Sequence, residues 1–180
     1  GKQAIFNLLQ VLLNPGDEVL LPAPYWLSYP EMAALAGART ITIPSTADDG
    51  FQLDLKALES RISPKSRLLI LNTPSNPTGR VMQRSELEQL AELVGRHPNL
   101  MVMCDEIYEY LLGDGLVHHS FAAVAETIRH RCFTVNGFAK GWAMTGWRLG
   151  YLAGDETVIK AAAALPVSYT HLTLPTISCV

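Results

Sequence analysis

Hydrophobic and polar residues recur along this chain with two periods, and segments of the two kinds follow one another in turn. Segments with apolar residues at helical spacing, such as 2–13 and 83–97, are predicted to be amphipathic helices. Short apolar runs, such as 67–71 and 99–104, are predicted to be buried strands. The alternation predicts an α/β fold of three layers, in which a mainly parallel central sheet carries helices on both faces.

The other predicted elements continue this alternation. Further strands are predicted at 18–21, 39–43, 131–135 and 147–153, and further helices at 28–37, 55–62, 121–128 and 155–165. Asn14-Pro15-Gly16-Asp17 ends the first helix, because proline and glycine do not continue one. Asp155 or Thr157 is expected to cap the last helix.

Composition limits the classes of function that fit. The chain has 180 residues, of which 48% are hydrophobic and 17% charged, which suits a globular domain. A net charge of −3 argues against a nucleic-acid partner, and no apolar run is long enough to span a membrane. Cys104, Cys132 and Cys179 lack metal or redox spacing, which favours a reducing compartment, the cytoplasm. The histidines lack ligand spacing, so no metal site is predicted.

A candidate for covalent chemistry lies between the predicted strands 131–135 and 147–153. Lys140 is surrounded there by small residues, and Arg148 follows eight positions later. Gly137, Ala139 and Gly141 are expected to keep the loop thin enough for a flat ligand to approach the backbone. Most lysines in loops are surface residues, but one in apolar surroundings is a candidate nucleophile for a Schiff base with a carbonyl cofactor.

Four other motifs are candidates for a binding site. Pro22-Ala23-Pro24-Tyr25-Trp26 is a rigid turn whose indole can stack on a flat ring, and Gly1-Lys2 opens a helix whose N–H groups can bind a phosphate. Asn72–Gly79 and Asp105–Tyr108 follow predicted strands, and ligands bind at the carboxyl ends of parallel strands. Each motif alone also has a purely structural explanation.

Together the motifs resemble the class I and II pyridoxal-phosphate-dependent aminotransferases. Residues 136–151 (Asn-Gly-Phe-Ala-Lys-Gly-Trp-Ala-Met-Thr-Gly-Trp-Arg-Leu-Gly-Tyr) are similar to the lysine signature of that family. Residues 72–79 are similar to its Asn-Pro-x-Asn-Pro-Thr-Gly motif, with Thr73 and Ser75 as variations. The resemblance covers about residues 1–165 and implies a fold type I, pyridoxal-phosphate-binding large domain that is incomplete at both ends. Residues 166–180 resemble translated adapter sequence and are expected to be a non-native tail.

The resemblance implies the cofactor pyridoxal 5′-phosphate and a role for each matching residue. The catalytic residues would be Lys140, which forms the Schiff base and acts as general base, Asp105 at the ring nitrogen and Tyr108 at the phenolic oxygen. These three would also bind the cofactor, together with Gly1, Lys2, Trp26, Asn76 and Arg148. Arg148 would hold the phosphate, Trp26 would stack on the ring, and Asn76 would bond the phenolic oxygen.

The same resemblance implies the substrates. Trp26, Asn76 and Lys2 would contact the substrate, Lys2 through the distal carboxylate of an acidic amino acid. It also implies cis bonds at Ala23–Pro24 and Asn76–Pro77.

The expected function is transamination between an amino acid and a 2-oxo acid, with aspartate and 2-oxoglutarate favoured by Lys2. A prephenate or aromatic amino acid aminotransferase would share nearly all of these residues. An aminotransferase-like effector domain of a transcription regulator is a further alternative, and it would carry a DNA-binding domain upstream. The resemblance implies a homodimer. The chain alone is expected to be inactive, because it lacks the small domain with the arginine for the substrate's α-carboxylate.

Overall fold

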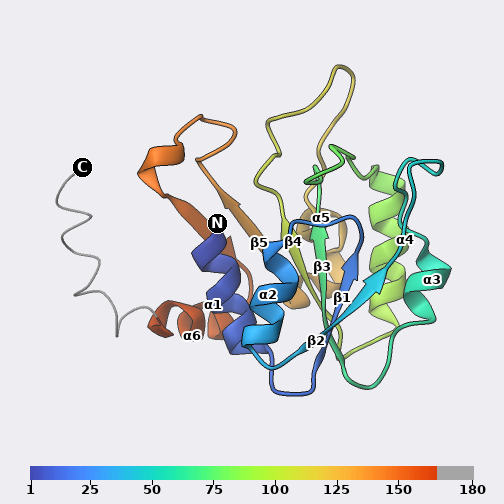
Figure 1. Ribbon diagram of the computed structural model, residues 1–180, viewed down its shortest axis with the longest axis vertical. Coiled ribbons are helices and arrows are strands. Elements are labelled where there is room, and N and C mark those ends of the chain that lie inside the picture. The colour runs from blue at the N-terminus through green and yellow to red at the C-terminus, as the bar shows by residue number, and fades with distance from the viewer. Residues whose placement is uncertain (166–180) are drawn as a thin grey trace.

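The computed structural model describes residues 1–165, which fold around one six-stranded sheet in the order β2-β1-β3-β4-β5-β6 (Figure 1). Five strands are parallel: β1 (Glu18–Pro22), β2 (Arg39–Ile43), β3 (Ser66–Asn72), β4 (Met101–Asp105) and β5 (Cys132–Gly137). The edge strand β6 (Gly150–Ala153) runs antiparallel to β5. The mainly parallel sheet predicted from the alternating pattern is confirmed.

Helices cover both faces of the sheet, as predicted (Figure 1). One face carries α1 (Lys2–Leu12), α2 (Ser28–Leu35) and α6 (Glu156–Ala164). The other carries α3 (Leu55–Glu59), α4 (Arg84–Gly95) and α5 (Phe121–Val124). Among residues 1–165, no helix has the length and apolar character that crossing a membrane requires.

Successive residues of β3 show how the two cores are formed. Leu68 and Ile70 pack into the core under α1 and α2, whereas Leu69 and Leu71 pack into the core under α4. Side chains of a strand point alternately to opposite faces, and here both faces are covered. A strand of this kind is therefore an unbroken apolar run in the sequence.

Capping side chains set the start of two helices. At the last helix, Asp155 accepts hydrogen bonds from the N–H groups of Thr157 and Val158 at 2.9 and 3.2 Å, so Asp155 is the cap of the two candidates. At α4, the Glu86 carboxylate accepts a hydrogen bond of 2.7 Å from the N–H of Gln83.

The structure corrects three predicted boundaries. The helix predicted at 55–62 ends at Glu59, and the one predicted at 121–128 is divided into α5 and the 3₁₀ helix η1 (Glu126–Arg131). The strand predicted from residue 147 begins at Gly150, because a second 3₁₀ turn, η2 (Thr145–Trp147), precedes it and pairing with β5 starts at Gly137. The prediction that 166–180 is a non-native tail concerns residues outside the described range, and it stays a prediction.

Candidate functional site

A pocket of about 260 Å³ lies at the carboxyl edge of the parallel strands, where the N-terminus of α1 also lies (Figure 1). The β3–α4, β4–α5 and β5–β6 loops meet at this edge. All eight residues that the sequence predicts for the site line this one pocket: Gly1, Lys2, Trp26, Asn76, Asp105, Tyr108, Lys140 and Arg148. Sites tend to form at this edge because the chain leaves every parallel strand there.

Asp105 is the last residue of β4 and is buried at the base of the pocket. Its Oδ2 accepts a hydrogen bond of 2.8 Å from the Tyr29 hydroxyl, and its Oδ1 accepts one of 3.2 Å from the N–H of Ile107. Burial raises the pKa of the Asp105 carboxyl, and these two hydrogen bonds oppose the rise. Within residues 1–165 no lysine, arginine or histidine forms an ion pair with it. A buried carboxylate of this kind fits a protonated ring nitrogen.

Lys140 and Arg148 both lie on the loop between β5 and β6, which confirms the predicted loop between two strands. Lys140 is exposed rather than surrounded by apolar side chains, and its Nζ lies 5.7 Å from the centre of the Tyr108 ring. Arg148 has left-handed backbone geometry with φ of 55°, which few residues other than glycine adopt. Its Nη1 donates a hydrogen bond of 3.2 Å to the carbonyl of Thr145.

Trp26 forms one wall of the pocket and is half-buried. The Nζ of Lys2 lies 5.0 Å from the centre of the Trp26 ring, within the range of a cation–π contact. The bonds Ala23–Pro24 and Asn76–Pro77 are cis, as predicted, and Thr73–Pro74 is a third cis bond that was not.

Two residues that take part in the site were not predicted from the sequence. Asn72, the last residue of β3, donates a hydrogen bond of 2.8 Å to the carbonyl of Asp105 and accepts one of 2.6 Å from the N–H of Asn76. It therefore joins the ends of β3 and β4 and fixes the backbone of Asn76. Tyr29 is the other, and its spacing of three residues from Trp26 was the only local signal.

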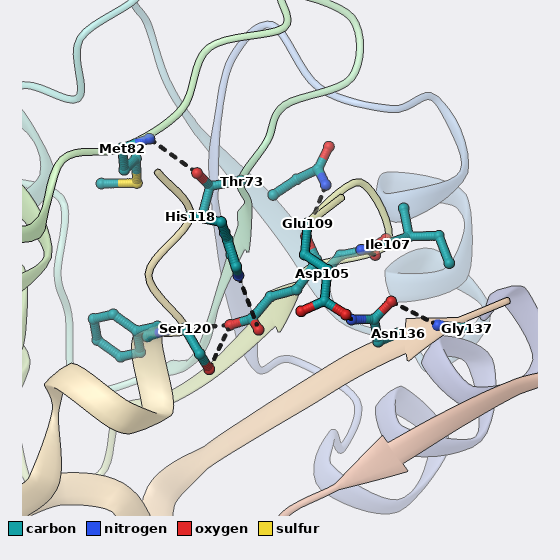
Figure 2. Close-up of polar contacts among 12 residues, drawn as sticks. Thr73, Met82, Asp105, Ile107, Glu109, His118, Ser120, Asn136 and Gly137 are labelled. Carbon is teal, nitrogen blue, oxygen red and sulfur yellow. Dashed lines mark hydrogen bonds and ion pairs between the residues drawn. The ribbon is translucent and has the colours of Figure 1, made fainter. Parts of the chain in front are cut away.

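A second polar cluster anchors the loop that follows β4 (Figure 2). The buried Glu106 carboxylate accepts hydrogen bonds from the Ser120 hydroxyl at 3.0 Å and the Phe121 N–H at 3.1 Å, and His118 Nε2 lies 3.3 Å from its other oxygen. Glu106, Glu109 and His118 bring possible ligand atoms within 4.8 Å of one another. Both oxygens of Glu106 already have polar partners, so we interpret this cluster as a set of polar contacts that anchors the loop after β4.

The glycines of the lysine loop have a different role from the predicted one. A Cβ on Gly137 would lie 2.8 Å from the carbonyl oxygen of Leu149, and one on Gly141 would lie 2.7 Å from the Tyr110 ring. Protein atoms fill the space that was expected to admit a ligand. The expectation was wrong for these two positions, whose lack of a side chain serves packing of the loop, while Ala139 lines the pocket.

The three-layer fold and a pocket that combines an amine, a buried carboxylate and a guanidinium are those of a fold type I, cofactor-dependent enzyme. The family model "Aminotransferase class I and II" matches residues 1–177, and the chain belongs to this family, which uses pyridoxal phosphate.

Similar proteins are known from bacteria and plants. The chain is 52% identical over 170 residues to the bifunctional aspartate aminotransferase and glutamate/aspartate-prephenate aminotransferase of Petunia hybrida, covering 94% of the chain and 35% of that protein. It is 47% identical over 161 residues to the probable aspartate/prephenate aminotransferase of Rickettsia bellii, and the match covers 89% of the chain and 40% of that protein. Among solved structures, aspartate aminotransferase from Thermus thermophilus with maleate superposes with a TM-score of 0.88 at 44% identity. The superposition covers 94% of the chain and 43% of the Thermus chain. The chain thus spans less than half the length of these relatives.

Proposed function

We propose that the protein carries out pyridoxal-phosphate-dependent transamination between an amino acid and a 2-oxo acid. The observation that carries this proposal is one pocket, lined by five separate segments of the chain, in which Lys140, Asp105 and Arg148 lie together. The similarity to aspartate and aspartate/prephenate aminotransferases supports it.

The chemistry of the donor set fits the cofactor. Arg148 offers a planar fork of N–H donors to the phosphate, next to the free N–H groups where α1 begins at Gly1. Trp26 offers an aromatic face to the ring, and Tyr108 and Asn76 offer donors to its phenolic oxygen. Asp105 offers a carboxylate to the ring nitrogen, and a carboxylate beside that nitrogen favours its protonated form.

When bound, pyridoxal phosphate supplies an aldehyde carbon for the substrate amine and a ring that takes up the electron pair released at the α-carbon. Lys140 would hold that aldehyde through its Nζ, and the substrate amine would displace the lysine when it binds the same carbon. The released Lys140 amine would then act as the general base that removes the α-proton. Asp105 would keep a proton on the ring nitrogen, which would make the ring a stronger electron acceptor, and Tyr108 and Asn76 would stabilise negative charge on the phenolic oxygen.

We propose aspartate and 2-oxoglutarate as the substrates. Lys2 lines the pocket and its amine lies 5.0 Å from the centre of the Trp26 ring, so it can meet a carboxylate at the end of an acidic side chain. Prephenate and aromatic acids are the second candidate, because the Petunia and Rickettsia relatives are named for prephenate and an aromatic aminotransferase from Pyrococcus horikoshii superposes with a TM-score of 0.88 at 38% identity.

A half-reaction screen of the complete protein tests this proposal. The cofactor-loaded protein is mixed separately with aspartate, glutamate, tyrosine and alanine, and the 2-oxo acid product is measured. We expect aspartate and glutamate to react, and the Lys2→Ala variant to lose rate with these two more than with tyrosine. Reaction with tyrosine alone would favour the second candidate, and absence of any 2-oxo acid would refute the proposal.

A further inference from the structure

Tyr29 has no role in the proposed chemistry, yet its side chain contacts two residues that do. It is 1% exposed on α2, and its hydroxyl donates a hydrogen bond of 2.8 Å to Asp105 Oδ2. Its ring meets the Trp26 ring edge to face, with 5.2 Å between the centroids and 86° between the planes. Its backbone N–H donates a hydrogen bond of 3.1 Å to the Trp26 carbonyl. One buried residue thus contacts both a wall of the pocket and the acid at its base.

The Tyr29 hydroxyl can donate a hydrogen bond to Asp105 only while it keeps its proton. Burial, and then the charge of Asp105, raises the pKa of Tyr29 well above its ordinary value, so the hydroxyl stays protonated at neutral pH. A hydroxyl that donates to a carboxylate stabilises the ionised form. With Ile107 on the other oxygen, each oxygen of Asp105 has one donor, which fixes the orientation of the carboxylate.

Building on the proposed function, we propose that Tyr29 is a positioning residue that holds Asp105 as an oriented carboxylate and so keeps the proton of a bound pyridine ring on the ring nitrogen. A proton shared between the two groups moves to the one with the higher proton affinity. Stabilising the carboxylate lowers the proton affinity of the carboxyl group and leaves the proton on nitrogen.

Other charged groups surround the pair without replacing this hydrogen bond. The titratable groups that act on Asp105 or Tyr29 are Cys104, Glu106 and Tyr108, and Lys140 and Arg148 line the same pocket. Within residues 1–165, Tyr29 and Ile107 are the donors to the Asp105 carboxylate. Removal of the Tyr29 hydroxyl therefore leaves a single donor.

The first experiment measures the protonation of the Asp105 carboxyl in the complete protein without cofactor, by carbon-13 NMR of the carboxyl groups across a pH titration. Tyr29→Phe removes the hydroxyl and keeps the ring against Trp26. We expect the proton affinity of Asp105 to rise about tenfold, the size of one hydrogen bond to a charged group. Tyr25→Phe is the matched control and should leave the titration unchanged. An Asp105 titration that is the same in Tyr29→Phe as in the wild type overturns the inference.

The second experiment locates the proton on a bound ring. Pyridoxamine phosphate labelled with nitrogen-15 in the ring is bound to each variant, and the nitrogen shift is recorded. In Tyr29→Phe the shift should move toward that of an unprotonated pyridine, whereas a tyrosine that only packs against Trp26 would leave it unchanged. An unchanged shift with bound ligand overturns this inference alone. Failure of the wild type to bind the ligand contradicts the proposed function as well.

A measurement on the wild type keeps the inference testable if Tyr29→Phe does not fold. With tyrosine labelled at Cζ, the Tyr29 signal should shift with the same midpoint as the Asp105 carboxyl, because the two groups share a hydrogen bond. A Tyr29 signal that stays constant while Asp105 titrates overturns the inference.

Discussion

Two residues of the pocket differ sharply in their surroundings, although both carry charge. Asp105 is buried and held from both oxygens, whereas Lys140 is exposed on a loop. Placing a carboxylate in a buried position costs free energy unless donors or a cation compensate it. An exposed amine is free to reach an incoming aldehyde. The buried acid is therefore suited to hold a ring nitrogen in place, and the exposed amine to react.

Lys140→Ala should abolish covalent attachment of the cofactor, because it removes the only amine assigned to that bond. The complete protein is incubated with pyridoxal phosphate and reduced with borohydride, and its peptides are analysed by mass spectrometry. We expect the wild type to gain the cofactor mass on the peptide that contains Lys140. Lys65→Ala, at an exposed site outside the pocket, is the control and should keep the label on Lys140. Full labelling or full turnover in Lys140→Ala would rule out the assignment.

Asp105→Ala should leave some cofactor bound but lower the transamination rate by about 100-fold or more, which is typical for loss of one electrostatic contact to a reacting group. The ring would lose the carboxylate that keeps its nitrogen protonated, while the phosphate contacts remain. Glu109→Gln changes a neighbouring carboxylate outside the pocket lining and serves as control. An unchanged rate in Asp105→Ala would show that the ring nitrogen is not held there.

The burial of Asp105 also leads us to expect that the stability of the cofactor-free protein depends on pH. Burial raises the pKa of its carboxyl on folding. Its contribution to stability is therefore fully present below the pKa of the unfolded chain and is lost as the pH rises through the folded pKa. Urea unfolding at a series of acid pH values should show this loss in the wild type and not in Asp105→Asn. The same slope in both proteins would contradict the prediction.

At the scale of elements, the pocket depends on how closely α1 approaches β6. A Cβ on Gly150 would lie 2.1 Å from the backbone nitrogen of Gly1 and 3.0 Å from the carbonyl oxygen of Asn136. Only a glycine at the start of β6 lets the first turn of α1 lie against the sheet. This contact brings the free N–H groups of the helix next to Arg148, where the phosphate of the cofactor is proposed to bind.

Gly150→Ala should therefore lower stability by about 1–3 kcal/mol, the usual range for an overpacked site. It should also weaken binding of pyridoxal phosphate, because the first turn of α1 has to move. Gly146→Ala, in the 3₁₀ turn η2 that precedes β6, is the matched control, since its Cβ would meet no atom within 4 Å. Urea unfolding and a binding titration measure the two effects. Equal stability and affinity in the two variants would contradict the proposed role of this close approach.

At the scale of the whole molecule, large aromatic side chains stand exposed around the pocket. Tyr110, Trp142 and Trp147 are 62%, 58% and 56% exposed, and Tyr110 and Trp142 meet edge to face with centroids 5.6 Å apart. Groups of exposed aromatic side chains are typical of surfaces that another protein, a ligand or a membrane covers. They lie on the loops that carry Tyr108 and Lys140, so whatever covers them also borders the pocket.

We expect the complete protein to be a homodimer in which this surface is covered. Sedimentation velocity over a range of concentrations should detect the dimer, and Trp142→Ser should shift it toward monomer. Leu35→Ser is the control, because Leu35 is 71% exposed on α2, away from these loops. A monomeric wild type at every concentration would refute the expected assembly.

The layered α/β architecture and most elements could be predicted from the sequence, because strands buried on both faces and amphipathic helices leave strong periodic patterns, as in 67–71 and 83–97. The eight residues that line the pocket were predicted through motifs that resemble the aminotransferase family, several of which follow predicted strands whose carboxyl ends share one edge of the sheet. The roles of these eight residues, and the non-native origin of residues 166–180, remain predictions.

How these residues are held in place could not be predicted from the sequence, because it depends on contacts between distant parts of the chain. The bond from Tyr29 to Asp105 joins residues 76 positions apart, and the close approach of Gly150 to Gly1 spans nearly the whole described chain. No local pattern records such contacts, because they depend on how α2 and α1 pack on the sheet. The exposure of Lys140 and the filled space beside Gly137 and Gly141 were settled in the same way. Periodicity reports which face of an element is buried, whereas only packing determines which atoms meet there.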